Sequence, residues 1–304
     1  MADALSGEVE ALLDEELNRV VPPAVAAAAA AVRDRHSRAA VAVLFYGSCL
    51  RAPEAELADN LLDFYVLVDD YTRAYDKAWL AVANRLLPPN AFYCETVWQG
   101  ARIRSKYVVI SLEDFENGCS PAARNVSIWA RFSQPARLVW ARDAAIAPRV
   151  LGACASAVRT MLRRAWPLDP LTRDARKLWL RALRETYAAE LRPESADRAV
   201  KIFEVDRARY ERLAAIVLAE LGRPELSPEA AARDWRGRRR LGKTLNLARI
   251  AKAAFTFDGG LDYVLWKIRR HSGVTIAVTD WQRRHPLLAA PRLAWRLYRR
   301  GAFR

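Results

Sequence analysis

Two apolar runs of strand length, separated by a short acidic insert, place the strongest constraint on how this chain folds. Residues 41–46 (VAVLFY) and 61–68 (LLDFYVLV) are rich in β-branched and aromatic side chains, which favour strands. The first run ends at Gly47-Ser48, where the backbone can turn tightly and expose N–H groups. The pattern therefore predicts two strands joined through a turn that could hold phosphate groups.

The second run carries one carboxylate, Asp63, within an otherwise apolar series. Burial of a carboxylate is costly unless a positive charge meets it, and we expect a divalent metal, Mg²⁺, as that partner. A second interpretation needs no chemistry, because Gly-Ser turns after strands are common and a strand aspartate can lie at a sheet edge. These two features alone favour the second interpretation, so further residues are needed to support a functional site.

The net charge of +14 is concentrated at one end of the 304-residue chain. Residues 231–304 contain 18 Lys and Arg against 4 Asp and Glu, whereas residues 1–230 contain 31 of each kind. This asymmetry indicates an anionic partner, either nucleic acid or lipid headgroups, for the C-terminal quarter.

Cysteine and histidine usage gives no sign of a cross-linked or zinc-bound fold. The four cysteines form no CxxC pair and the three histidines match no zinc spacing, so we expect neither disulfides nor structural zinc. The acidic, amphipathic N-terminus differs from a signal or transit peptide. No uninterrupted apolar span reaches membrane-crossing length, so we expect a soluble protein in a reducing compartment unless it adheres to a membrane surface.

The alternation of patterns predicts an α+β architecture in three parts. These parts are a mixed-sheet domain over 1–145, a helical domain over 146–228 and a basic amphipathic segment over 229–304. Further strands are expected at 92–98, 106–112 and 136–140, and helices at 8–33 with a break at Pro22-Pro23, at 75–87 and at 126–132. Long helices follow, with Ser195 as the expected N-cap of a run over 199–221 and Ser227 as the cap of the next helix.

Residues 237–244 (GRRRLGKT) formally satisfy the pattern of a phosphate-binding loop, G-x-x-x-x-G-K-[ST]. Such a loop needs a buried strand leading into its first glycine, whereas the preceding residues 229–236 are polar and helix-forming. We therefore predict that Lys243 is a surface or lipid-facing lysine and that the protein hydrolyses no ATP.

Several short motifs occur in the order found in a known family. They are Tyr46-Gly47-Ser48, Leu62-Asp63-Phe64 followed by Asp69-Asp70, Lys106-Tyr107 through Ser111, Arg131 after a short helix, and Thr186-Tyr187 through Glu190 and Arg192. On these residues the chain resembles the peripheral, mitochondrial-matrix type of phosphatidate cytidylyltransferase (CDP-diacylglycerol synthase), within the polymerase-β-like nucleotidyltransferases. It departs from the family at Val108, where the family has glycine, at Glu190, where it has aspartate, and in lacking a histidine after Asp69-Asp70.

The resemblance implies a nucleotidyltransferase that transfers a cytidylyl group from CTP to phosphatidate, giving CDP-diacylglycerol and pyrophosphate in phospholipid synthesis. It implies that the mixed-sheet domain is the nucleotidyltransferase domain. The residues it marks as catalytic are Asp63, Lys106 and Glu190, and those it marks as substrate-binding are Gly47, Ser48, Tyr107, Arg131 and Arg192.

The metal ligands need a separate argument, because Tyr65 fills the second position of the Asp-x-Asp pair common in the superfamily. Asp69 and Asp70 lie about 20 Å along an extended strand from Asp63, at about 3.3 Å per residue. We therefore expect Mg²⁺ to be held by Asp63 and Glu95, which begins a neighbouring strand. The alternative interpretation of Glu95 is a solvated glutamate at a strand end.

Two other functions stay open from sequence alone. One is nucleotidyl transfer to a soluble acceptor such as an antibiotic, a sugar or an RNA end, and the other is non-catalytic nucleic-acid binding through the arginine-rich tail. The basic amphipathic tail favours a membrane acceptor, so we expect a cytoplasmic protein held peripherally on the inner face of a membrane, with nucleic acid an unlikely partner. The side chains expected to meet the membrane are Leu247, Ile250, Phe255, Trp266, Trp281 and Trp295, with Lys252, Lys267, Arg269, Arg270, Arg296, Arg299 and Arg300.

Overall fold

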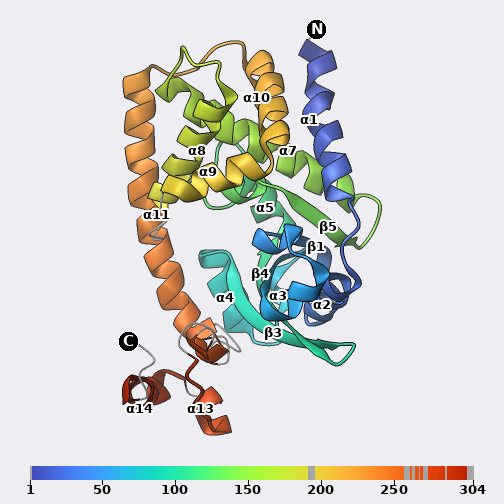
Figure 1. The fold of residues 1–304 in the computed structure, drawn as a ribbon, viewed down its shortest axis with the longest axis vertical. Coiled ribbons are helices and arrows are strands. Elements are labelled where there is room, and N and C mark those ends of the chain that lie inside the picture. The colour runs from blue at the N-terminus through green and yellow to red at the C-terminus, as the bar shows by residue number, and fades with distance from the viewer. Residues whose placement is uncertain are drawn as a thin grey trace.

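A five-stranded mixed sheet forms the centre of the computed structural model, which describes residues 2–190, 196–256, 261, 264–266, 268–269, 273–284 and 286–299 (Figure 1). The strand order is β3-β4-β2-β1-β5. The strands are β1 (Ala40–Tyr46), β2 (Leu61–Val68), β3 (Asn90–Trp98), β4 (Ala101–Ser111) and β5 (Ala136–Ala141). Helices surround this sheet, so the predicted α+β class is confirmed.

The pairing of the strands places β2 in the middle of the sheet. It runs antiparallel to β1 on one side and parallel to β4 on the other, while β3–β4 and β1–β5 are antiparallel pairs. The insert between β1 and β2 forms two 3₁₀ helices, η1 (Ser48–Arg51) and η2 (Glu54–Asp59). Both predicted core strands are present, and the second has the predicted bounds.

Side chains alternate along the strands, and each face of the sheet is covered by helices. On one face, Tyr65 and Leu67 of β2 belong to a large core that continues into the helical layer. On the other face, Phe64 and Val66 belong to a second core. This second core lies under α2 (Pro23–Asp34), α3 (Tyr71–Ala74) and α4 (Ala78–Leu86).

The large core has no break at the predicted domain boundary of residue 145. It takes residues from the sheet, from α1 at the N-terminus and from the helices that follow β5. The helices of this layer are α1 (Ala2–Leu17), α5 (Leu112–Cys119), α6 (Trp129–Phe132), α7 (Ile146–Ala165), η3 (Trp166–Leu168), α8 (Ala175–Ala189), α9 (Ala196–Val205) and α10 (Arg207–Leu221). The sheet and the helical layer are therefore held together by one hydrophobic interior.

Most expected elements are present, with differences at their ends. The break at Pro22-Pro23 separates α1 from α2, whereas β4 begins at Ala101, earlier than predicted. The run over 199–221 was predicted as one helix, and this is wrong: the backbone of Asp206 has φ −123° and ψ 37°, which separates α9 from α10. The predicted cap Ser195 lies outside the described residues.

One long helix, α11 (Pro228–Thr256), joins the helical layer to the C-terminal segment. The hydroxyl of Ser227 accepts a hydrogen bond from the backbone N–H of Ala230 at 3.3 Å, so the predicted cap is confirmed. Residues 237–244 lie inside this helix, and Lys243 is exposed. As predicted, the motif is therefore not a phosphate-binding loop.

Beyond α11 the chain forms α13 (Asp280–Arg284) and α14 (Pro286–Arg299), which project from the body of the molecule (Figure 1). Ala289, Leu293 and Leu297 of α14 form a small separate core with Ile276, which precedes α13. Among the helices of the described ranges, none is both long enough and apolar enough to cross a membrane.

Candidate functional site

Asp63 lies at the centre of a row of polar side chains that crosses the sheet. In the strand register it is opposite Tyr46 of β1 on one side and Lys106 of β4 on the other. Lys106 is in turn opposite Tyr93 of β3. Residues directly opposite one another point to the same face, so all four side chains share the face that meets the helical layer. The pairing of β2 with β4 thus brings together two residues 43 positions apart that sequence analysis assigned to catalysis.

Gly47 follows β1 and lies directly against the carboxylate of Asp63. Its φ is +92°, in the region that favours glycine. A Cβ at this position would lie 3.3 Å from Asp63 Oδ2, which is tighter than an ordinary contact. The turn therefore needs glycine twice, for its backbone conformation and for its approach to Asp63. The next residue, Ser48, is exposed and begins η1.

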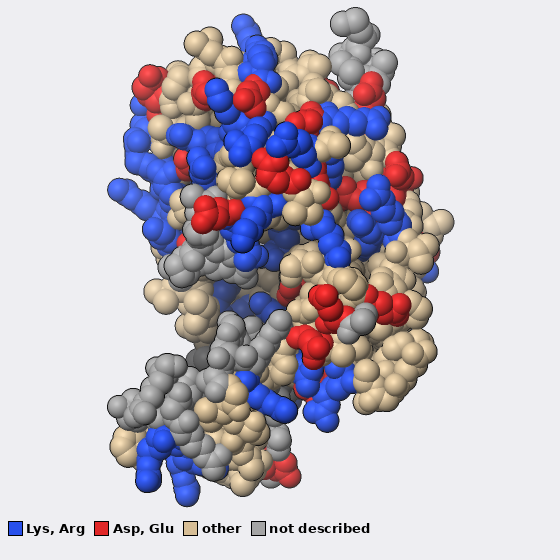
Figure 2. Space-filling model, in the orientation of Figure 1, with Lys and Arg blue, Asp and Glu red and all other residues tan. Residues whose placement is uncertain are grey.

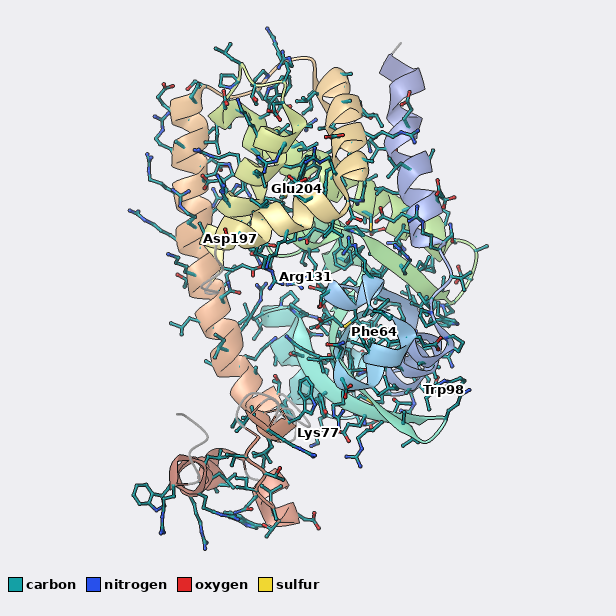
Figure 3. The ribbon with its side chains drawn as sticks, viewed as in Figure 1. Phe64, Lys77, Trp98, Arg131, Asp197 and Glu204 are labelled. Carbon is teal, nitrogen blue, oxygen red and sulfur yellow. The ribbon has the colours of Figure 1, made fainter. Side chains whose placement is uncertain are left out.

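Arg131 on α6 brings a buried positive charge to the same place. Its guanidinium lies 5.0 Å from the ring centroid of Tyr46, and its Nε has no hydrogen-bond partner among the described residues. Burial alone lowers the pKa of Arg131, but Tyr46, Tyr65, Glu190 and Asp63 together outweigh it and raise that pKa. Figure 3 places Arg131 between the sheet, where Phe64 is labelled, and α9, which carries Asp197 and Glu204.

Glu190 ends α8 and is held near Arg131 by the packing of α8 against α11. It is the C-cap residue of α8. A Cβ on Gly242 of α11 would clash with the carbonyl oxygen of Ala189, so the two helices cross in close contact at the residue before Glu190. The apparent phosphate-loop glycine thus has a packing role, because only a residue without a side chain fits against the end of α8.

Two basic residues of α11 reach this region and were missed by the sequence analysis. Arg249 donates hydrogen bonds to the carbonyl of Pro88 at 2.9 Å and to Ser127 Oγ at 3.2 Å. Burial lowers its pKa, and Tyr65 and Glu190 counteract this while Arg131 adds to it. Lys252 donates to the carbonyls of Leu87 and Pro89. The expectation that Lys252 faces lipid is therefore wrong.

The orientation of α11 explains why these residues were missed. Leu247 and Ile250 were expected to meet a membrane, and at 64% and 62% exposed they lie on the outward face of the helix. The inward face follows the spacing of Gly242, Asn246 and Arg249, three or four residues apart. That spacing is the signal in the sequence from which the inward position of Arg249 could have been derived.

Two predicted site residues, Tyr107 and Glu95, are not brought to Asp63. Tyr107 points to the opposite face of the sheet, where it is 2% exposed and stacks on Phe92 at 5.3 Å. Tyr107 is therefore a core residue and does not line the site. Arg192 lies outside the described residues.

Glu95, the expected second metal ligand, lies level with Arg104 and not with Asp63. Two strand spacings, on the order of 10 Å, separate β3 from β2, and the register adds an offset of two residues. Its carboxylate is 3.0 Å from Arg102 and 3.6 Å from Arg104. This arrangement corrects the expectation that Glu95 and Asp63 share a metal.

A cavity of about 660 Å³ lies beside this row, between the β3–β4 hairpin and the C-terminal segment. Its sheet side is polar, with Glu95, Arg102 and Arg104, and its other side includes Trp266 and Ile276. The guanidinium of Arg104 lies 5.7 Å from the ring centroid of Trp266. The cavity therefore combines arginines, including Arg269 of the C-terminal segment, with apolar groups.

The residues present fit Mg²⁺ through one carboxylate. No group of three or more His, Cys, Asp or Glu side chains suited to a metal occurs in the described parts of the chain. Mg²⁺ is commonly bound by one or two carboxylates together with substrate phosphates and water. The space that Gly47 leaves in front of Asp63 Oδ2 suits such an arrangement.

Positive charge dominates the surroundings of Asp63. Figure 2 shows a hollow at mid-height of the molecule, between the helical layer and the sheet, with Lys and Arg at its floor. Such a site can hold several phosphoryl groups while a single carboxylate holds a cation. No protein-family model and no curated protein matches the chain, so the family resemblance stays a prediction.

Proposed function

We propose that the protein is a nucleotidyltransferase that transfers the cytidylyl group of CTP to phosphatidate, giving CDP-diacylglycerol and pyrophosphate. The observation that carries the proposal is the contact between Gly47 and Asp63, in register with Lys106 and near Arg131. A tight glycine turn, a lone carboxylate and two cations are the groups that phosphoryl transfer requires. The family resemblance supplies the identity of the two substrates.

In this reaction a phosphate oxygen of phosphatidate forms a bond to the α-phosphorus of CTP. The bond from that phosphorus to the oxygen bridging to the β-phosphate breaks, and pyrophosphate leaves with its electron pair. The attacking oxygen is already anionic, so no general base is needed. Catalysis then consists of positioning the two phosphates and stabilising the negative charge that they share.

Each residue near Asp63 has a role in that stabilisation. The N–H groups of the Gly47-Ser48 turn would hold the leaving phosphates, and Lys106 would contact the α-phosphate from the neighbouring strand. Arg131 would take the phosphate of the acceptor, because its buried guanidinium is rigidly placed over Tyr46. Mg²⁺ bound at Asp63 would neutralise charge on the phosphates of CTP.

Glu190 and Arg249 would both influence Arg131. Both interact electrostatically with Arg131, Glu190 with opposite charge and Arg249 with like charge. The carboxylate of Glu190 would hold the guanidinium of Arg131 in place. Arg249 would add a third positive charge at the junction of the sheet and α11.

The acceptor side of the proposal rests on two amphipathic surfaces. The cavity between the hairpin and the C-terminal segment combines arginines with Trp266 and Ile276, as a phosphate attached to acyl chains would require. On α14, Leu288 and Trp295 are 72% and 61% exposed. Arg292 and Arg299 are exposed on the same helical face, at steps of three or four residues. Such a face suits an anionic membrane surface.

The direct test supplies each of the four radiolabelled nucleoside triphosphates together with phosphatidate vesicles, RNA or aminoglycoside and sugar acceptors. We expect label from CTP alone to enter the lipid fraction, and Asp63→Asn to abolish this at unchanged thermal stability. Asp76→Asn, an exposed carboxylate of similar chemistry, is the matched control. Label in a soluble acceptor or in RNA would show that this acceptor, and not phosphatidate, is the substrate. Full activity of Asp63→Asn would show that the site lies elsewhere.

A further inference from the structure

A second cavity, of about 390 Å³, lies where α1, η1, the start of β5 and the start of α10 meet. It is separate from the cavity beside the β3–β4 hairpin. Its lining contains five arginines, which come from η1, β5, α10 and the connection after α1. They are Arg19, Arg51, Arg137, Arg209 and Arg212.

Three of these arginines are matched by carboxylates of the same cavity. Glu15 lies 3.1 Å from Arg19, and Glu16 lies 2.5 Å from Arg209. Asp206 forms an ion pair with Arg51. Each of the three lining carboxylates therefore has its own guanidinium.

The other two arginines, Arg137 and Arg212, form no ion pair within 4.0 Å of a carboxylate among the residues that the structure describes, although Glu16 acts on Arg137 electrostatically. Arg137 is partly buried, and its guanidinium donates to the backbone carbonyl of Ala136 at 2.9 Å. Arg212 is exposed at the cavity. The cavity therefore holds two positive charges in excess of its carboxylates.

The surroundings of these groups favour an anion. Burial, with Arg19, Arg51 and Arg209 adding to it, lowers the pKa of Arg137, although Glu16 acts in the opposite direction. The first turn of the 15-residue helix α10 also lines the cavity, and the positive end of its dipole adds to the same field. A bound anion would relieve the repulsion between the guanidinium groups.

We propose that this cavity binds the phosphoryl groups of a polyphosphate, with Arg137 and Arg212 as its principal ligands. Guanidinium groups bind phosphate oxygens through paired, charge-assisted hydrogen bonds. A volume of about 390 Å³ exceeds what a single water or halide needs. Arg51 and Arg209 would complete the contacts while remaining paired with their carboxylates.

The cavity adjoins the end of β1, because Leu50 and Arg51 of η1 and Arg137 of β5 line it. Arg51 ends η1, the turn that starts just after Gly47. Arg137 follows Ala136, which is opposite Tyr46 in the register, and is itself opposite Phe45, whose side chain belongs to the second core. The ligand is therefore either free pyrophosphate or the terminal phosphates of a nucleotide bound at Gly47. The anion site stands on its own geometry, and only the second source rests on the proposed function.

Calorimetric titration of the full chain with pyrophosphate, in EDTA to remove divalent metal, tests the proposal. We expect Arg137→Gln and Arg212→Gln each to weaken binding by about tenfold or more, a change of the size expected for one charge-assisted contact. Arg240→Gln, which removes an exposed arginine of α11 outside the cavity, should change binding less than about twofold.

Repeating the titration with saturating CTP identifies the source of the phosphate. The cavity belongs to the nucleotide's own phosphates if saturating CTP abolishes pyrophosphate binding and the Arg137→Gln variant binds CTP more weakly than wild type. Unchanged pyrophosphate binding in CTP assigns it to a free anion. Wild-type protein that binds no pyrophosphate, or binding that depends on Lys106 and not on Arg137 or Arg212, would overturn the proposal. Neither result involves the transferase assay, so the two proposals fail separately.

Discussion

Lys106 lies directly opposite Asp63 in the parallel pairing of β2 with β4. The two side chains share one face of the sheet, and they come from segments separated along the chain by β3 and α4. The carboxylate proposed to bind a cation and the lysine proposed to bind a phosphate therefore lie on adjacent strands, about 5 Å apart at the backbone. The fold, and not a local loop, fixes their separation.

Substitution of Lys106 tests whether this relationship serves catalysis. We expect Lys106→Gln to lower kcat/KM for CTP by about 100-fold, the size of effect seen when one donor to a transition-state oxyanion is removed. Thermal stability should change little, because the residue is only partly buried. Lys201→Gln on α9, an exposed lysine, is the control. Equal rates for the two variants would show that Lys106 has no role in the reaction.

Gly47 and Gly100 form a matched pair for testing the contact with Asp63. Both have positive φ, +92° and +78°, but only Gly47 has Asp63 within contact distance of a Cβ. Alanine at either position should cost about 1 kcal/mol of unfolding free energy through backbone strain. Only Gly47→Ala should also lose activity. Enzyme rates and urea unfolding curves of both variants separate the two effects, and parallel losses would contradict the proposed turn.

Gly242 and Gly237 make a similar comparison within α11. Gly237 has no atom within 4 Å of a built Cβ, so Gly237→Ala should stabilise the helix by up to about 1 kcal/mol. Gly242→Ala should destabilise the protein by about 1 to 3 kcal/mol, because its Cβ would clash with the carbonyl of Ala189. It should also lower activity by moving Glu190. Unfolding curves measure the first effect and kcat the second, and a stable, active Gly242→Ala protein would disprove the close crossing.

Lys252 gives a prediction for pH. Burial, the main cause, and the charge of Arg249 lower the pKa of Lys252 to about 8. In the unfolded chain its pKa returns to about 10.4, so between these values the unfolded state binds more protons and stability rises with pH. Urea unfolding from pH 7 to 10 should therefore show wild type gaining stability relative to Lys252→Met above pH 8. Lys243→Met, on the exposed face of α11, should show no such trend. A constant difference across that range would mean that Lys252 titrates as an ordinary lysine.

The exposed face of α14 can be tested by vesicle sedimentation. Trp295→Asp should reduce binding to anionic vesicles by about tenfold or more, because it replaces an interfacial aromatic with a charge of the wrong sign. Leu171→Asp removes a still more exposed apolar side chain, 90% accessible, from the connection between η3 and α8, and should have no effect. Binding should also weaken with salt. Equal binding of both variants, or equal binding to neutral vesicles, would exclude attachment through this face.

The strands of the site could be predicted from sequence because their signals are local. Val41–Tyr46 and Leu61–Val68 are apolar runs whose ends are fixed by Gly47 and by Asp69, so their bounds and type followed from side-chain pattern alone. Lys106 and Arg131 were found only through the family resemblance. Their arrangement around Asp63 depends on a parallel pairing of β2 with β4 that no local pattern encodes.

The errors arose where orientation, not secondary structure, decided the role of a residue. Tyr107 follows Lys106 in a strand, and period-two alternation turns it to the opposite face, into the core with Phe92. On α11, Leu247 and Ile250 are exposed, but Lys252, which was expected to face lipid, lies on the inward stripe with Arg249. Carbonyl groups of Leu87, Pro88 and Pro89 are their partners, and such backbone acceptors leave no trace in a sequence.

Because α11 is one unbroken helix of 29 residues, it is about 44 Å long at about 1.5 Å per residue. It is fixed at Gly242 against α8, it reaches the Asp63 region at Arg249, and it ends at the base of the C-terminal segment. A helix of this length acts as a stiff lever, and its last two turns connect Arg249 to that segment. A tilt at the C-terminal end of α11 would therefore also shift Arg249, because the two lie within one rigid stretch of the helix.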